Sequence, residues 1–81
     1  MKLQNWNMFP VSINANATAG TPFIVTHGCT VEDIPTAPRG LLITRRFSLA
    51  ALYYDSSTWT TTQATLTSDT ASATFNVLFF T

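Results

Sequence analysis

The chain has little charge, one cysteine and no long apolar run, and each shortage excludes a class of protein. Only eight of its 81 residues are formally charged, four of each sign, so neither non-specific DNA binding nor an anionic membrane partner is expected. Because Cys29 is the only cysteine, a disulfide within the chain is excluded. No apolar run reaches bilayer-spanning length, and the amino end lacks the apolar core of a secretory signal. We therefore expect a chain made in a reducing cytoplasm.

What the chain has instead is hydroxyl and apolar side chains. Thr occupies 15 positions and Ser six, in a sequence that is 46% hydrophobic, a composition that favours strands and solubilises weakly. A chain this short buries only about 60% of its surface on folding, so disulfides, metals or subunit contacts usually add stability. One His and one Cys are too few for a structural zinc site in one chain. The sequence therefore predicts a homo-oligomer.

The organising segment is Gly40–Arg46, GLLITRR, which predicts a central strand. Alternation places Leu41, Ile43 and Arg45 on one face, and Leu42, Thr44 and Arg46 on the other. We expect it to pair with the next apolar run, Leu49–Tyr54. The segment Cys29–Pro38 is expected to be a loop. Other strands are predicted at Val11–Asn16, Phe23–His27, Thr58–Thr61, Gln63–Ser68 and Ala73–Phe80.

These patterns predict an all-β fold, a small antiparallel β-sandwich or barrel of about six to seven short strands. We expect residues 1–20 to form an N-terminal arm that carries the first edge strand, and residues 21–81 to form the sandwich domain. The arm contains Trp6, Met8 and Phe9 among mostly polar residues. It is either a frayed terminus or an attachment segment whose large apolar side chains anchor on a partner.

No catalytic, metal or cofactor site is predicted. His27 and Cys29 share a strand face, and a Cys–His pair can supply a nucleophile and its base, but no other motif provides an oxyanion site. A lone Cys among apolar strands is usually buried, and His27 is expected to cap a strand end by bonding a backbone carbonyl. A three-nitrogen metal site made by His27 on a three-fold axis stays an alternative. The scattered acids give no paired-carboxylate site.

Two other groups are candidate binding residues. Arg39, Arg45 and Arg46 fall within eight positions and would hold a phosphate or an acidic sugar. Alternatively they pair, within or between subunits, with acids: Glu32, Asp33 or Asp55. We take Arg45 and Arg46 as assembly contacts.

Three aromatic residues, Tyr53, Tyr54 and Trp59, would form a platform for a glycan, or else fill a core or an interface.

Three sequence segments follow one another in an order that is typical of a known small module: TPFIVTHG, then PRGLLITRR, then YYDSSTWTTTQATLTSDTASATFNVLFF. From Thr21 to Phe80 the chain resembles a small β-rich module of tailed-bacteriophage virion proteins, of the tail-fibre and head-decoration type. Cys29 stands where that module usually has leucine, and the loop at 30–37 is longer than expected. The resemblance implies a non-enzymatic virion subunit, commonly a trimer, made in the bacterial cytoplasm. It would assemble with itself and with capsid or tail proteins, and the alternative is a carbohydrate-binding module that recognises a host surface glycan.

Overall fold

The computed structural model describes residues 2–3 and 6–81, with side chains from Asn7 onward. The described chain is all-β, apart from one 3-10 turn, η1, at Ser56–Thr58. Its strands are β1 Lys2–Leu3, β2 Trp6–Asn14, β3 Phe23–Thr26, β4 Thr30–Val31, β5 Ile34–Pro35, β6 Gly40–Arg46, β7 Leu52–Tyr53, β8 Gln63–Ser68 and β9 Thr74–Phe80.

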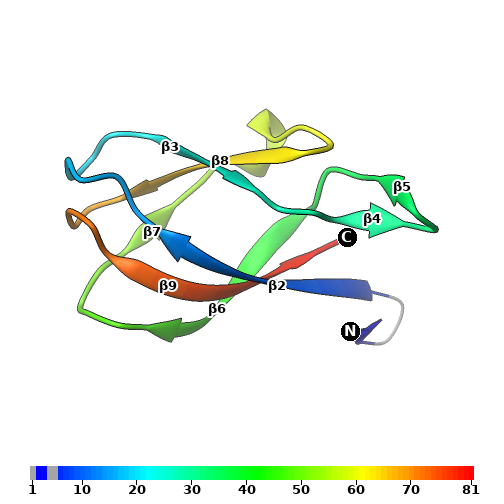
Figure 1. Cartoon of the computed structure of the whole chain (residues 1–81), viewed down its shortest axis with the longest axis horizontal. Coiled ribbons are helices and arrows are strands. Elements are labelled where there is room, and N and C mark those ends of the chain that lie inside the picture. Colours follow the sequence, from blue (N-terminus) through cyan, green and yellow to red (C-terminus); the bar gives the residue numbers. More distant parts are fainter. Residues whose placement is uncertain (1, 4–5) are drawn as a thin grey trace.

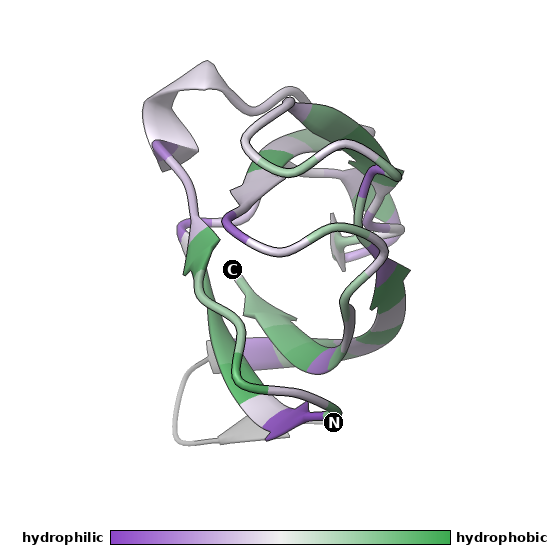
Figure 2. Cartoon of the chain, turned by 90° about the vertical axis from the view of Figure 1, so that its left-hand side faces the viewer, coloured by the Kyte–Doolittle hydropathy of each residue, from purple (hydrophilic) through white to green (hydrophobic). Residues whose placement is uncertain are grey.

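The strands form three small antiparallel sheets that are arranged like a sandwich. The largest has the order β1-β2-β9-β6, a second has the order β3-β8-β7, and β4 and β5 form a two-stranded hairpin. In Figure 1 the first sheet lies below the second, and the β4–β5 hairpin extends at the right-hand end. The end-on view shows the two larger sheets on opposite sides of the core, with hydrophobic stretches concentrated in their strands (Figure 2).

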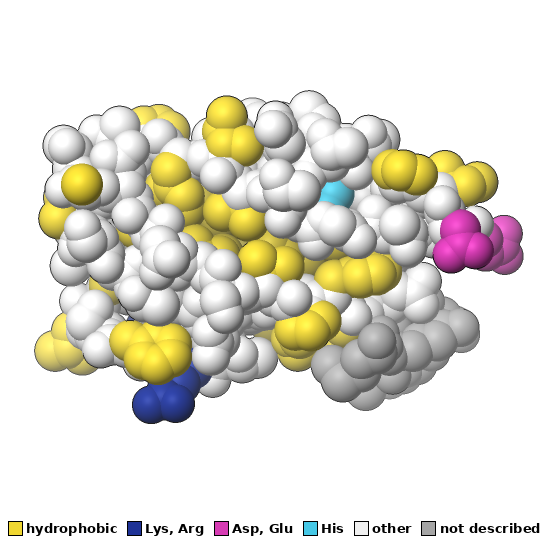
Figure 3. Space-filling view, in the orientation of Figure 1, with side chains coloured by type: hydrophobic (Ala, Val, Ile, Leu, Met, Phe, Trp, Pro, Cys, Tyr) yellow, Lys and Arg dark blue, Asp and Glu magenta, His cyan; other side chains and the backbone are white. Residues whose placement is uncertain are grey.

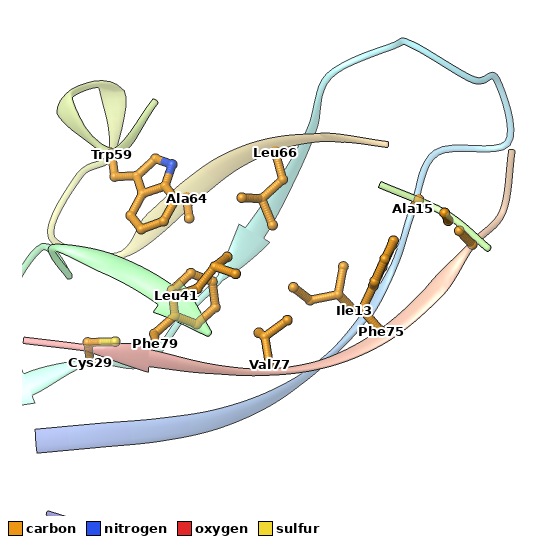
Figure 4. Close-up of a cluster of buried hydrophobic side chains, with 12 residues drawn as sticks. Ile13, Ala15, Cys29, Leu41, Trp59, Ala64, Leu66, Phe75, Val77 and Phe79 are labelled. Carbon is orange, nitrogen blue, oxygen red and sulfur yellow. The ribbon is translucent and has the colours of Figure 1, made fainter. Parts of the chain in front are cut away.

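Strand β9 is the centre of the main sheet, because it pairs with β2 on one side and β6 on the other. Its alternation places Phe75, Val77 and Phe79 on one face, and all three are fully buried. These side chains meet Leu66 and Ala64 from β8, so one core lies between the two sheets (Figure 4). The predicted strand β8 has the expected bounds.

Strand β6 has the predicted bounds but not the predicted position. It pairs with β9 and is an edge strand, rather than a central strand paired with the segment that follows. A bulge between Ile43 and Arg45 shifts the register, so Arg45 lies opposite Asn76 and Arg46 opposite Phe75. The bulge interrupts the expected alternation and leaves both arginines exposed at the strand end.

Three other expectations were wrong in detail. The segment Cys29–Pro38 is not only a loop, because it contains the β4–β5 hairpin. The expected strand at Thr58–Thr61 is absent from the described structure, since Asp55 caps the 3-10 turn instead by accepting the N–H of Ser57. The first edge strand, expected at Val11–Asn16, is β2 at Trp6–Asn14; it lies between β1 and β9 and not at an edge, and it pairs with β9 from Met8 to Asn14.

Candidate functional site

The residues proposed to anchor the amino-terminal segment are largely built into the fold. Met8 is buried, and Phe9 is partly buried and packs against the core. The Met8 side chain is therefore not a free anchor, whereas the attachment role of Phe9 stays a prediction. Trp6 opens β2, but its side chain lies outside the described part of the chain.

Arg45 and Arg46 form a cationic surface at the end of β6. The guanidinium of Arg45 lies over the ring of Phe47, 4.4 Å from its centroid, in a cation–π arrangement. Arg46 donates from Nε to the carbonyl oxygen of Ala50 at 3.0 Å. Phe47 is half exposed and Leu49 is fully exposed. Residues 45–49 thus present two cations together with two large apolar groups, and we call them the basic patch.

The basic patch has no carboxylate partner among the described residues. The sequence allowed Arg45 and Arg46 to pair with Glu32, Asp33 or Asp55 within the subunit, and within residues 7–81 neither arginine forms such a pair. Arg39 is placed differently, because its Nη2 donates to the carbonyl oxygen of Thr81 at 2.8 Å. The three cations therefore do not converge on one phosphate-sized site.

Two of the acids lie together at the tip of the β4–β5 hairpin. Glu32 and Asp33 form its two-residue turn, at φ values of 50° and 65°. Both are exposed, as are the flanking Val31 and Ile34, of which Ile34 is 66% exposed. We call residues 31–34 the acidic tip. In Figure 3 acidic side chains gather at the right-hand end, over this hairpin, and cationic side chains lie at the lower left beside a hydrophobic group.

The aromatic platform is reduced to two tyrosines. Trp59 is only 7% exposed. Its ring packs edge-on against the ring of Phe79, with centroids 5.5 Å apart, and its Nε1 donates to the carbonyl oxygen of Thr65 at 3.0 Å. It is a core residue, as the alternative interpretation held, and offers no face to a sugar. Tyr53 and Tyr54 are 59% and 43% exposed.

The tyrosines border a shallow hollow of about 330 Å³, which Pro22, Asp55 and Thr58 also line. The ring of Tyr54 packs on Trp59, with centroids 5.0 Å apart. This stacking fixes the Tyr54 ring, so the hollow has one rigid aromatic wall.

His27 and Cys29 make a structural rather than a nucleophilic pair. The backbone N–H of Cys29 donates to His27 Nδ1 at 3.0 Å, so that nitrogen is an acceptor and the ring proton lies on Nε2. Nε2 is 2.9 Å from the carbonyl oxygen of Thr60, to which it donates. The predicted carbonyl contact of His27 is confirmed, and neither ring nitrogen is directed at the thiol. Burial raises the pKa of the Cys29 thiol to about 11, which disfavours the reactive thiolate.

Within the described chain, no cluster of three His, Cys, Asp or Glu residues could hold a metal ion. The described residues also include no helix of the length and hydrophobicity needed to cross a membrane. Sequence reasoning missed Val31, Ile34, Phe47 and Leu49 as surface residues. The sequence does place apolar residues next to each charged pair, since Glu32-Asp33 lies between Val31 and Ile34, and Arg45-Arg46 is followed by Phe47 and Leu49.

No protein-family model, curated protein or solved structure matches the chain.

Proposed function

We propose that this chain is a small structural subunit of a tailed-phage virion, of the decoration, head-fibre or tail-fibre-associated kind, that works by assembly and not by catalysis. The observation that carries the proposal is the amount of apolar surface on so small and weakly charged a chain. Large apolar side chains that are about half exposed or more occur on every sheet and in the segment that follows β6: Ile24, Ile34, Leu42, Phe47, Leu49 and Tyr53. Such surface is typical of a protein that is covered by neighbours.

Open strand edges support the same role. Strand β6 forms one edge of the main sheet, and β3 and β7 are the edges of the second sheet. Unpaired strand edges in a chain with few surface charges favour association with other chains. A virion subunit is surrounded by copies of itself and by larger capsid or tail proteins, which would cover these edges. The resemblance of residues 21–80 to phage virion modules supports this class of assembly, and within that class a trimer.

The test is mass spectrometry of purified particles. A structural subunit occurs at a fixed ratio to the capsid protein, and it is lost from particles made without its gene. Its absence from particles, with the protein remaining in the soluble fraction of the lysate, would refute the proposal.

The second candidate is a carbohydrate-binding module, which the hollow beside Tyr53 and Tyr54 favours. Exposed tyrosine rings next to hydroxyl and carboxylate groups suit the alternating apolar and polar faces of a sugar. Glycan-array binding that is lost in Tyr53→Ala would support this function. Tyr53→Phe is the control, because it keeps the ring face.

A further inference from the structure

Two surfaces at opposite ends of the molecule complement each other in both charge and polarity. The acidic tip, residues 31–34, carries Glu32 and Asp33 between the exposed side chains of Val31 and Ile34. The basic patch, residues 45–49, carries Arg45 and Arg46 beside the exposed Phe47 and Leu49. Each surface therefore combines two like charges with two large apolar groups, and the charges are of opposite sign.

The acidic tip and the basic patch of one chain lie too far apart to contact each other. The molecule measures 36 × 22 × 15 Å along its principal axes, and Figure 3, with the long axis horizontal, shows the acidic and the cationic groups at opposite ends. Within residues 7–81 neither Arg45 nor Arg46 forms an ion pair with an acid. The contact that their charges favour has to come from another molecule.

We propose that the occupant of each surface is a second copy of this chain, with the acidic tip of one subunit docked on the basic patch of the next. This inference deepens the assembly role proposed above and rests on it. A partner with the opposite charge and a similar apolar content is already present in the chain itself, so no other molecule needs to be invoked. Opposite charges on the two surfaces also set the orientation of the subunits, because tip-to-tip and patch-to-patch contacts would repel.

The geometry of both surfaces suits docking. The acidic tip projects at the end of a short hairpin, so it can enter a neighbouring surface without moving the core (Figure 1). On the basic patch, Phe47 holds the Arg45 guanidinium, and the Ala50 carbonyl holds Nε of Arg46, which leaves the remaining guanidinium donors for a carboxylate. Asp69 contacts the segment that follows the basic patch, but its carboxylate is engaged within the subunit. Its Oδ1 accepts hydrogen bonds from the N–H of Ala51 and the hydroxyl of Thr70.

Contacts between different surfaces of identical subunits have a defined consequence. They are heterologous, and they close into a ring when the rotation between neighbours permits it, or continue as a filament when it does not. The proposed trimer is one such ring. The contact is expected to weaken with salt, because both surfaces are exposed before association.

The decisive experiment uses two charge-reversed variants of the full chain. Variant one carries Arg45→Glu and Arg46→Glu, and variant two carries Glu32→Lys and Asp33→Lys. Each variant alone has the same sign of charge on both surfaces, so self-association should fall about tenfold or more relative to the unchanged protein. When the two variants are mixed, a contact between one variant and the other again joins opposite charges, whereas a closed trimer would keep one contact between two copies of the same variant. Sedimentation velocity should then show that the mixture associates more strongly than either variant alone, as dimers or longer alternating assemblies.

A neutral variant separates association from folding. Glu32→Asn with Asp33→Gly removes both charges and provides residues that the turn accepts readily, so this variant should fold well and yet associate about tenfold more weakly. Self-association of this variant at unchanged strength would overturn the proposal, as would a mixture of the charge-reversed variants that stays dissociated.

If the unchanged protein occupies particles but remains monomeric in solution up to millimolar concentration, the self-contact is refuted and the virion role stands. If the protein assembles in solution but is absent from particles, the virion role fails alone.

Discussion

The turn of the β4–β5 hairpin should lower the stability of the subunit, and replacing it should raise that stability. Glu32 and Asp33 both have positive φ, at 50° and 65°. An L-residue other than Asn, Asp or Gly pays about 1–2 kcal/mol in this region, so the cost falls on Glu32 and not on Asp33. A two-residue turn with positive φ at both positions favours Asn-Gly. Glycine at position 33 offsets about 0.5–1 kcal/mol of this gain, because it has more conformational freedom to lose from the unfolded chain. The double variant Glu32→Asn/Asp33→Gly should therefore gain about 0.5–1 kcal/mol in the free energy of unfolding.

For a domain of this size, that gain corresponds to a rise in Tm of roughly 2–8 °C. The assay is thermal unfolding followed by circular dichroism, at concentrations low enough to keep the protein dissociated. The matched control is Glu32→Gln/Asp33→Asn, which removes the charges but keeps side chains of the same shape, and it should stay within about 0.5 kcal/mol of the unchanged protein. If the Asn-Gly variant is no more stable than this control, the turn carries no backbone cost and the reasoning is wrong.

Three further predictions concern the core, the thiol and two acids. Phe79→Ala should lower the free energy of unfolding by about 3–5 kcal/mol, because Phe79 is fully buried against Trp59; a denaturant midpoint close to that of the unchanged protein would contradict the assigned core. Native Cys29 should react slowly with a thiol reagent at pH 8, because its pKa is raised to about 11, and should react rapidly once urea is added; equal rates in both states would show an exposed thiol. Hydrogen bonds from Ser57 lower the pKa of Asp55, and the N–H of Ala51 lowers that of Asp69. Their contribution to stability is therefore present above the ordinary value of 3.8 and is lost as the pH falls through the lower native pKa. Asp55→Asn/Asp69→Asn, which removes both titrations, should flatten the acid limb of a Tm-against-pH curve, and an unchanged limb would refute this assignment.

The strands with clean alternation could be predicted from the sequence. β8 alternates between apolar and polar residues along its length and β9 does so from Thr74 to Val77, and the core depends on that pattern, since Phe75, Val77 and Phe79 are all fully buried. The burial of Cys29 could be predicted as well, because a lone cysteine between apolar strands behaves as a small hydrophobic residue. At β8, β9 and Cys29 the local sequence pattern and the tertiary fold both require the same side chains to be buried.

Pairing partners and surface geometry could not be predicted in the same way. Strand β6 bypasses its sequence neighbour to pair with β9, because burial of Leu41 opposite Phe79 outweighs the advantage of a short connection. The bulge after Ile43 has no glycine to indicate it. The turn places Glu32, a residue type that rarely adopts positive φ, at its first position, so the sequence around it indicates a loop and not a hairpin. The basic patch and the acidic tip depend on these three features.

The central position of β9 has a consequence for the order in which the chain can fold. Hydrogen-bonded neighbours on β2 and β9, such as Asn14 and Thr74, are 60 positions apart, so the pairing of β9 depends on long-range contacts. While the ribosome has completed the chain only to Ser68, β2 and β6 have no partner strand between them. Their apolar faces then remain open to solvent or to a chaperone, and folding of the main sheet must follow the synthesis of β9. A short truncation that removes Phe79 and Phe80 should consequently yield aggregated protein and not a partly folded subunit.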